Sequence, residues 1–135
     1  MKILIMGLPG SGKTALAKAL QEKLNCDWFN ADAIREQFDD WDFSLEGRIR
    51  QSRRMRDLAN TCFGDVIVDF VAPLQEMRNI FNPDILIWVD RIEESVYKDT
   101  NLLFQIPTNY DIKIPFGLSI DEEVELFLVY KKHLS

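Results

Sequence analysis

Cysteine and long apolar runs are both scarce in this chain. There are two cysteines, Cys26 and Cys62, among 135 residues. Because two cysteines so far apart do not amount to a disulfide framework, we expect a reduced, intracellular chain. No stretch approaches the roughly 18 apolar residues of a membrane-spanning helix. The first apolar run ends at Gly7, which is too early for a signal peptide. These absences predict a cytoplasmic protein without a membrane partner.

Positive charge is also in the minority. Sixteen lysines and arginines stand against 22 aspartates and glutamates, so the net charge is −6. Neutralisation of phosphates dominates the binding of long nucleic acids, and the acidic balance therefore argues against such a partner. It leaves room for a small local cationic site. The remaining composition, 47% hydrophobic and 28% charged residues, excludes disordered classes and fits one domain over residues 1–135.

Short apolar segments alternate with helical patterns along the chain. We expect strands in five segments, at residues 2–6, 27–30, 65–71, 84–89 and 112–114. We expect helices at residues 13–24, from Ser44 to about Cys62, after Pro73, and after the capping-box pair Ser119 and Glu122. This alternation, without repeats or a linker, predicts a single α/β domain that is doubly wound around a parallel sheet.

The first expected strand leads into a phosphate-binding loop. Eight residues match the pattern G-x-x-x-x-G-K-[ST] at every fixed position: Gly7, Leu8, Pro9, Gly10, Ser11, Gly12, Lys13 and Thr14. Glycines let successive backbone N–H groups turn toward a phosphate, and the following helix points its positive dipole end there. The alternative is a glycine-rich turn without a ligand. We predict ATP binding, with Lys13 on the β- and γ-phosphates and Thr14 on Mg²⁺.

Two aspartates are candidates for the metal. A loop of this kind works with a carboxylate near Mg²⁺, usually at the carboxyl end of a neighbouring strand. Asp32 follows the second expected strand, and Asp69 lies inside the apolar run of the third. Asp32 could instead cap a helix over residues 33–38, a role compatible with catalysis. A structural role explains Asp69 less well, because a buried carboxylate is costly unless it is paired or bound to metal. We predict that both aspartates bind metal and act in catalysis.

Arginine is concentrated in the expected helix after Ser44. Five arginines fall within nine residues: Arg48, Arg50, Arg53, Arg54 and Arg56. They cannot all share one helix face, so some of them belong to a solvated basic face. Arg35 and Arg78 lie near the expected carboxyl ends of strands. Because guanidinium groups match phosphate and sulfate bidentately, we expect a few of these seven side chains to hold an anionic substrate.

Several segments, taken together and in order, resemble the adenylylsulfate kinases, P-loop kinases that phosphorylate adenosine 5′-phosphosulfate. The similarity runs from Met1 to about Leu103 and includes the phosphate-binding loop. Residues 30–35 (NADAIR) resemble the family's D-G-D-N-x-R segment. The family's helix pattern F-S…R-x-x-x-x-R-R…A is matched in spacing by Phe43, Ser44, Arg48, Arg53, Arg54 and Ala59. The family's F-I-S-P…R segment is matched by residues 70–73 (FVAP) and Arg78.

The resemblance implies transfer of the ATP γ-phosphoryl group to the 3′-hydroxyl of adenylylsulfate, giving 3′-phosphoadenylylsulfate. It implies the three-layer P-loop fold, a five-stranded parallel sheet with helices on both faces. Asp32 would approach the attacking hydroxyl or the metal, and Phe43 would stack on the substrate adenine. From their positions in the family's segments, Lys98 would contact ATP. The remaining contacts with the substrate would come from Arg35, Arg48, Gln51, Arg78 and Phe104. Family members often dimerise, so a homodimer is a further expectation.

The sequence departs from the family at five places. Gln51 replaces an asparagine that contacts substrate, and Asp69 and Ala72 stand where the family commonly has serine. Residues 98–104 (KDTNLLF) replace R-D-P-K-G-L-Y, and the lysine-containing lid is reduced to residues 105–110. A short lid excludes water less well. Two alternatives therefore stay open: another small-molecule or polynucleotide 5′-kinase on the same scaffold, and a non-catalytic nucleotide-binding regulator.

Overall fold

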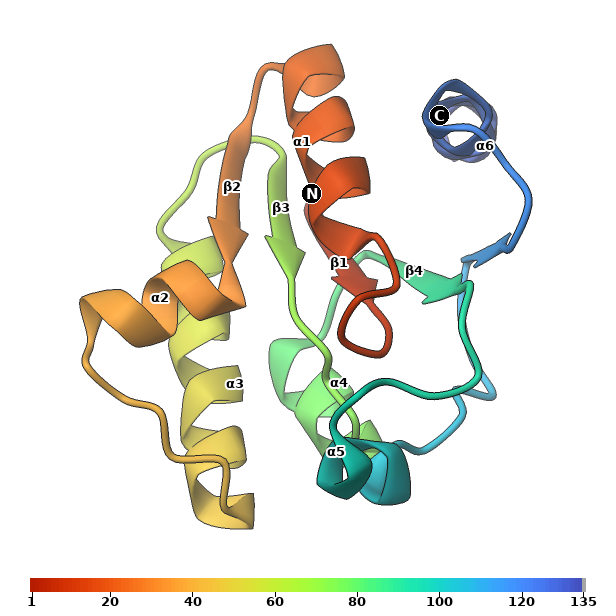
Figure 1. The fold of residues 1–135 in the computed structure, drawn as a ribbon. Coiled ribbons are helices and arrows are strands. Elements are labelled where there is room, and N and C mark those ends of the chain that lie inside the picture. Colours follow the sequence, from red (N-terminus) through yellow and green to blue (C-terminus); the bar gives the residue numbers. More distant parts are fainter. Residues whose placement is uncertain (135) are drawn as a thin grey trace.

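The five expected strands form one parallel sheet. The computed structural model describes residues 1–134. The strands are β1 (Lys2–Met6), β2 (Asp27–Asn30), β3 (Val66–Asp69), β4 (Ile85–Asp90) and β5 (Ile112–Pro115). They lie in the order β2-β3-β1-β4-β5, and every neighbouring pair is parallel. The predicted α/β class, the doubly wound parallel sheet and its five strands are therefore confirmed (Figure 1).

The helices are divided between the two faces of this sheet (Figure 1). They are α1 (Lys13–Leu24), α2 (Ala31–Gln37), α3 (Leu45–Asn60), α4 (Gln75–Phe81), α5 (Lys98–Leu103) and α6 (Ile120–His133). Helices α1 and α6 cover one face, and α2, α3 and α4 cover the other. Helix α5 was not expected from the sequence. Among residues 1–134, no helix combines the length and the apolar character needed to cross a membrane.

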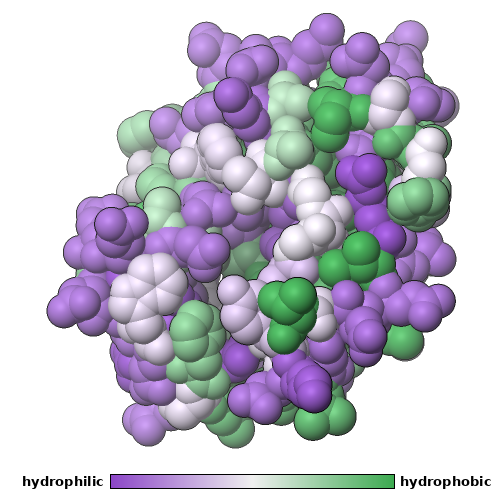
Figure 2. Space-filling view, viewed as in Figure 1, coloured by the Kyte–Doolittle hydropathy of each residue, from purple (hydrophilic) through white to green (hydrophobic). Residues whose placement is uncertain are grey.

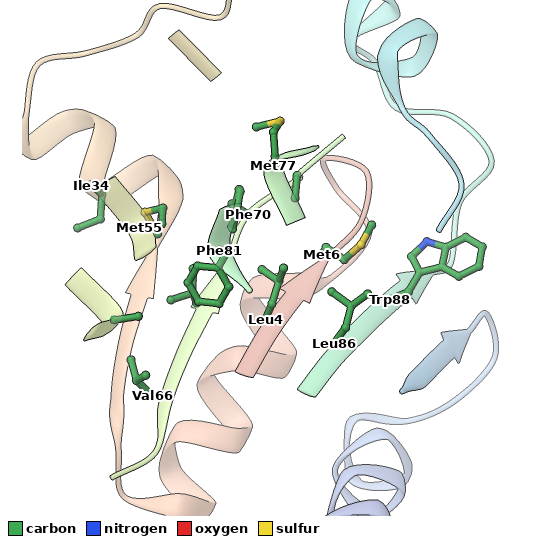
Figure 3. Packing of buried hydrophobic residues seen from close by; sticks show 13 residues of the cluster. Leu4, Met6, Ile34, Met55, Val66, Phe70, Met77, Phe81, Leu86 and Trp88 are labelled. Atoms are coloured by element: carbon green, nitrogen blue, oxygen red, sulfur yellow. The ribbon is translucent and has the colours of Figure 1, made fainter. Parts of the chain in front are cut away.

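The alternation of side chains along β1 builds both halves of the core. Leu4 and Met6 point to the α3–α4 face, where they join a buried cluster with Phe81 (Figure 3). Ile3 and Ile5 point to the opposite face and join the cluster under α1 and α6. All four side chains have no exposed surface. A strand buried on both faces reads as a continuous apolar run, which is why its position could be predicted.

Several boundaries differ by a residue or two from the sequence expectation, and two of them lie near the carboxyl ends of β2 and β3. The third strand ends at Asp69 rather than at residue 71, because the chain leaves the sheet toward Ala72, which has a left-handed φ of 45°. Helix α2 begins at Ala31, and its N-cap is Asn30, whose side chain accepts a hydrogen bond from the backbone N–H of Ala33. The alternative that Asp32 caps this helix is therefore wrong, because Asn30, two positions earlier, provides the oxygen.

The carboxyl ends of the strands meet at one edge of the sheet. β1 leads there into the phosphate-binding loop, β2 ends at Asn30 and β3 ends at Asp69. Asn30 and Asp69 are register partners on adjacent strands. In open α/β sheets, ligands bind in the crevice outside the carboxyl ends of the strands. The topology therefore brings the loop and the two strand ends to the place where a ligand site is expected.

Candidate active site

The phosphate-binding loop has the backbone conformation that its glycines allow. Gly7 has φ 154°, and a Cβ at this position would lie 2.5 Å from the carbonyl oxygen of Val89. Gly12 has φ 99° in the left-handed region, and α1 begins at the next residue. Side chains at these two positions would meet a close neighbour or strain the backbone. The loop thus passes close to β4 and turns directly into the helix N-terminus.

Lys13 lies at the base of this loop with only 8% of its surface exposed. Its Nζ donates a hydrogen bond to the carbonyl oxygen of Leu8 at 3.1 Å. Burial lowers the pKa of Lys13, and the nearby charges of Asp69 and Asp32 act in the opposite direction. The ammonium group is thus bonded to the loop, and the charges of both candidate carboxylates act on it.

Asp69 is held in place by two donors at the end of β2. Its side chain is 2% exposed. Trp28 Nε1 donates to Oδ2 at 2.5 Å, and Asn30 Nδ2 donates to Oδ1 at 3.0 Å. Burial raises the pKa of Asp69, whereas these two hydrogen bonds and the charge of Lys13 lower it. Asp69 is thus a buried carboxylate whose position depends on side chains of the neighbouring strand.

A cavity of about 1070 Å³ extends from the phosphate-binding loop to α5. Nine of the residues predicted for the site line it: Pro9, Gly10, Lys13, Thr14, Asp32, Phe43, Arg48, Asp69 and Lys98. Figure 2 shows this side of the molecule, on which hydrophilic residues predominate and hydrophobic residues lie in separate groups between them. The cavity therefore joins the loop, both candidate carboxylates and one of the seven arginines considered from the sequence.

Two predicted substrate residues, one in α2 and one in α3, form hydrogen bonds with other groups of the chain. Arg35 is 4% exposed and donates to the carbonyl oxygens of Asp40 and Asp42 at 2.9 and 3.2 Å. Gln51 donates to the carbonyl oxygen of Ala31 at 3.1 Å and accepts from Arg54 at 2.9 Å. Neither side chain lines the cavity. In this conformation Arg35 holds the segment between α2 and α3, whereas Gln51 connects α3 with the start of α2.

Arg78 and Phe104 also lie outside the cavity lining. Arg78 is 2% exposed, and it donates to the carbonyl oxygens of Ala72, Pro73 and Gln105 at 2.9, 3.3 and 2.6 Å. Its guanidinium carbon lies 5.4 Å from the ring centroid of Phe104. Burial lowers the pKa of Arg78 to about 10. Arg78 therefore fastens the segment after α5 to the start of α4.

The phosphate-binding loop and most of the sheet lie in a segment that matches a known protein family. The family described as an AAA domain matches residues 3–99, which includes the phosphate-binding loop, Asp32 and Asp69. The chain belongs to this AAA-domain family. None of the curated proteins matches the chain. The family match therefore supports the P-loop assignment over most of the chain.

Solved structures with the same fold as this AAA domain include several small kinases. The Mycobacterium tuberculosis APS kinase CysC, in complex with AMPPNP and APS, matches with a TM-score of 0.82 and 20% identity, over 97% of this chain and 96% of that chain. A Sinorhizobium meliloti gluconokinase matches with a TM-score of 0.77 and 15% identity, over 98% of this chain and 92% of that chain. The Aquifex aeolicus shikimate kinase matches with a TM-score of 0.74 and 16% identity, over 98% of this chain and 97% of that chain. The resemblance to APS kinases is thus confirmed for the fold, which is shared with kinases of other names.

Several residues that line the site of this AAA domain were not predicted. Asn30, Trp41, Tyr97 and Thr100 line the cavity, and Trp28 donates a hydrogen bond to Asp69. Thr100 accepts a 3.4 Å hydrogen bond from Nη2 of Arg48. Its position next to Lys98 and Asp99 is a sequence signal by which it could have been predicted as a site residue. The other contacts depend on how β2 and β3 pair and on the path of the loop before α3. No spacing in the sequence indicates them.

The polar residues at the loop fit a magnesium ion. Within residues 1–134, no group of three or more His, Cys, Asp or Glu side chains could hold a metal by itself. Mg²⁺ does not need such a cage, because it is usually bound by one or two carboxylates together with waters and substrate phosphates. Thr14, Asp32 and Asp69 line the same cavity as Lys13. This set of hydroxyl and carboxylate oxygens beside a phosphate-binding loop is suited to a magnesium–nucleotide complex.

Proposed function

We propose that this protein is an ATP- and Mg²⁺-dependent kinase that phosphorylates a hydroxyl group of a small anionic nucleotide, with adenylylsulfate as the preferred acceptor. The observation that carries the proposal is the single cavity that joins two different ends. One end holds Lys13 and Thr14 of the phosphate-binding loop, and the other holds Phe43 and Arg48. Phosphoryl transfer needs a donor and an acceptor held in line, and one continuous cavity of this size can hold both.

At the donor end, the chain supplies positive charge and oriented backbone groups. The N–H groups of the loop and the N-terminus of α1 would bind the phosphates of ATP. Lys13 would neutralise charge that develops on the transferring group. Thr14, Asp32 and Asp69 would hold Mg²⁺, which supplies further neutralisation of the phosphate oxygens when it is bound. Lys98, exposed at the start of α5, would contact the nucleotide from the opposite wall.

At the acceptor end, an exposed aromatic ring and a buried arginine lie next to each other. Phe43 is 50% exposed, and the guanidinium carbon of Arg48 lies 5.4 Å from its ring centroid. Arg48 Nε donates to the carbonyl oxygen of Phe43 at 2.9 Å, which fixes the pair. A flat ring suits a nucleobase, and the remaining guanidinium N–H groups suit an anionic group. The acceptor hydroxyl would attack the γ-phosphorus while its proton passes to Asp32 and the bond to the β-phosphate oxygen breaks.

A different acceptor on the same scaffold is the second candidate. Two of the residues expected to hold the phosphosulfate, Arg35 and Gln51, are engaged by backbone and side-chain partners of their own chain. The same fold occurs in a gluconokinase and a shikimate kinase. An acceptor with a single carboxylate or phosphate would need fewer guanidinium contacts than adenylylsulfate does.

The test is an acceptor panel. Purified protein is incubated with ATP and Mg²⁺, and ADP is followed with adenylylsulfate, a 5′-hydroxyl oligonucleotide, nucleosides, gluconate and shikimate offered in turn. Turnover with adenylylsulfate above all others is the expected result. Turnover with another acceptor in the panel would replace the proposed substrate and leave phosphoryl transfer standing. Tight ATP binding without product from any acceptor would contradict the proposed kinase activity and favour a nucleotide-binding regulator.

A further inference from the structure

The carboxylate of Asp69 receives one hydrogen bond on each oxygen from β2. The indole Nε1 of Trp28 donates to Oδ2, and the amide Nδ2 of Asn30 donates to Oδ1. A carboxylate oxygen has two lone pairs, so each oxygen keeps one acceptor position after these contacts. The two donors fix the plane of the carboxylate and leave it able to bind a cation. Because the aspartate is buried, donors on both oxygens also offset part of its loss of hydration.

Asn30 reaches the phosphate-binding loop as well. Its Nδ2 lies 3.4 Å from Oγ1 of Thr14, and its Oδ1 accepts from the backbone N–H of Ala33 at 3.0 Å. The side-chain amide therefore cannot rotate without losing contacts on both of its ends. It joins the end of β3, the start of α2 and the start of α1. Two oxygens proposed as magnesium ligands, from Thr14 and Asp69, are thus connected through one amide group.

The side chain at position 30 is a neutral amide, which does not repel the carboxylate of Asp69. Asn30 and Asp69 are register partners on parallel strands, which lie roughly 4.8 Å apart. A second carboxylate at position 30 would face that of Asp69 across this distance and repel it. The neutral amide instead donates a hydrogen bond to the carboxylate. Trp28 adds the second donor while its ring packs against the cluster under α1 and α6, which holds the indole in place.

We propose that Trp28 and Asn30 are positioning residues that orient Asp69 and Thr14 toward the magnesium–nucleotide complex. The inference rests on the proposed function. It goes beyond that function because neither residue needs to touch ATP, the metal or the acceptor. Both act through the direction in which they hold the oxygen atoms of Asp69 and Thr14. Residues that hydrogen-bond to metal ligands orient the ligand oxygens in this way.

The first test observes the hydrogen bond itself, without metal or substrate. In a proton NMR spectrum, the indole N–H resonance of Trp28 is expected far downfield of those of Trp41 and Trp88, because a carboxylate accepts it. Asp69→Asn retains the shape of the side chain and removes its charge, so it should move the Trp28 resonance upfield and leave the other two within their normal range. A Trp28 resonance unchanged by Asp69→Asn would overturn the proposal.

The second test separates metal binding from turnover. ATP affinity is measured by calorimetry with and without Mg²⁺ for the wild type, Trp28→Phe and Asn30→Asp. Asn30→Asp retains an oxygen for the Ala33 N–H, and Asn79→Asp makes the same exchange at an exposed site on α4 as a matched control. We expect the affinity gained from Mg²⁺ to fall about tenfold in both site variants, which corresponds to about 1.4 kcal/mol. Affinity without Mg²⁺ should stay within twofold of the wild type.

The outcomes distinguish this inference from the proposed function. If no acceptor is phosphorylated but the magnesium-dependent gain falls in both variants, the positioning role stands and the kinase assignment fails. If adenylylsulfate is phosphorylated and the gain is unchanged in Trp28→Phe and Asn30→Asp, the positioning role is wrong and the kinase assignment stands. A wild-type protein whose ATP affinity does not respond to Mg²⁺ at all would overturn both. Circular dichroism of every variant checks that the fold is retained.

Discussion

Lys13 is the residue on which the proposed chemistry depends most. Its side chain is almost fully buried at the phosphate-binding loop, so its charge acts where water screens it little. Lys13→Ala should lower kcat/KM by at least about a hundredfold, or about 2.7 kcal/mol of transition-state stabilisation. Steady-state kinetics with ATP and the acceptor found in the panel would measure this loss.

Lys18→Ala is the matched control for this prediction. Lys18 lies on the same helix, α1, but its side chain is exposed and outside the cavity lining. This variant should retain wild-type kinetics. Equal activity of Lys13→Ala and Lys18→Ala would contradict the role of the phosphate-binding loop in turnover.

At the scale of single residues, a motif predicts position better than it predicts role. The glycines, Lys13 and Thr14 could be predicted because the chemistry of the loop is local to eight consecutive residues. Arg35 matches its family segment in sequence, yet its guanidinium group is occupied by carbonyl oxygens of the loop before α3. Trp28 and Asn30 were not predicted as site residues because their contacts with Asp69 arise from strand pairing. Contacts across a sheet carry no fixed spacing along the sequence.

At the scale of elements, Arg78 connects α4 to the segment that follows α5. Its guanidinium group donates to three backbone carbonyl oxygens and is almost fully buried. Arg78→Met retains much of the side-chain length and leaves these carbonyls without that donor. We expect the free energy of unfolding to fall by about 3 kcal/mol, because hydrogen bonds to a charged group are lost in a buried place. Urea denaturation would measure this change.

Arg53→Met provides the comparison for Arg78→Met. Arg53 is an exposed residue on α3, so its replacement should change the free energy of unfolding by no more than about 0.5 kcal/mol. If Arg78→Met unfolds like the wild type and instead raises the KM of the acceptor, then Arg78 contacts substrate and the structural role is wrong.

The elements themselves were predicted in proportion to their burial. The strands β1, β3 and β4 are covered on both faces, and their apolar runs could be recognised directly. Helix α1 was predicted with its observed bounds, since leucines four residues apart follow the phosphate-binding loop. Helix α5 was missed because it is one short helix with a single buried residue, Thr100, and no apolar periodicity.

At the scale of the whole molecule, the order of the strands brings the site together. β1, which carries the phosphate-binding loop, lies at the centre of the sheet between β3 and β4. This central position places the loop beside Asp69 and beside the segment that follows β4. Alternating strands and helices predicted a parallel sheet, but not which strand lies between which neighbours. The order follows from long-range packing of α1, α3, α4 and α6 on the two faces, which no local pattern contains.

An ion pair between Asp65 and Lys131 connects the start of β3 with the end of α6. Lys131 Nζ donates to Asp65 Oδ2 at 2.9 Å, and both side chains are about one quarter to one third exposed. This hydrogen bond lowers the pKa of Asp65 below its ordinary value. A carboxyl group with a depressed folded-state pKa stabilises the fold above its unfolded pKa, near 4, and this contribution is lost as the pH falls through the folded-state value.

Asp65→Asn should therefore lower the free energy of unfolding by about 1 kcal/mol at pH 7, and the difference from the wild type should shrink toward zero near pH 2. The difference between the two proteins is the informative quantity, because burial raises the pKa of Asp69 and Glu123 and shifts the acid stability of both proteins alike. Asp57→Asn, at an exposed pair with Arg56, should change little at either pH. Urea denaturation between pH 2 and pH 7 gives the measurement. A difference that persists undiminished at pH 2 would mean that Asp65 contributes packing rather than charge.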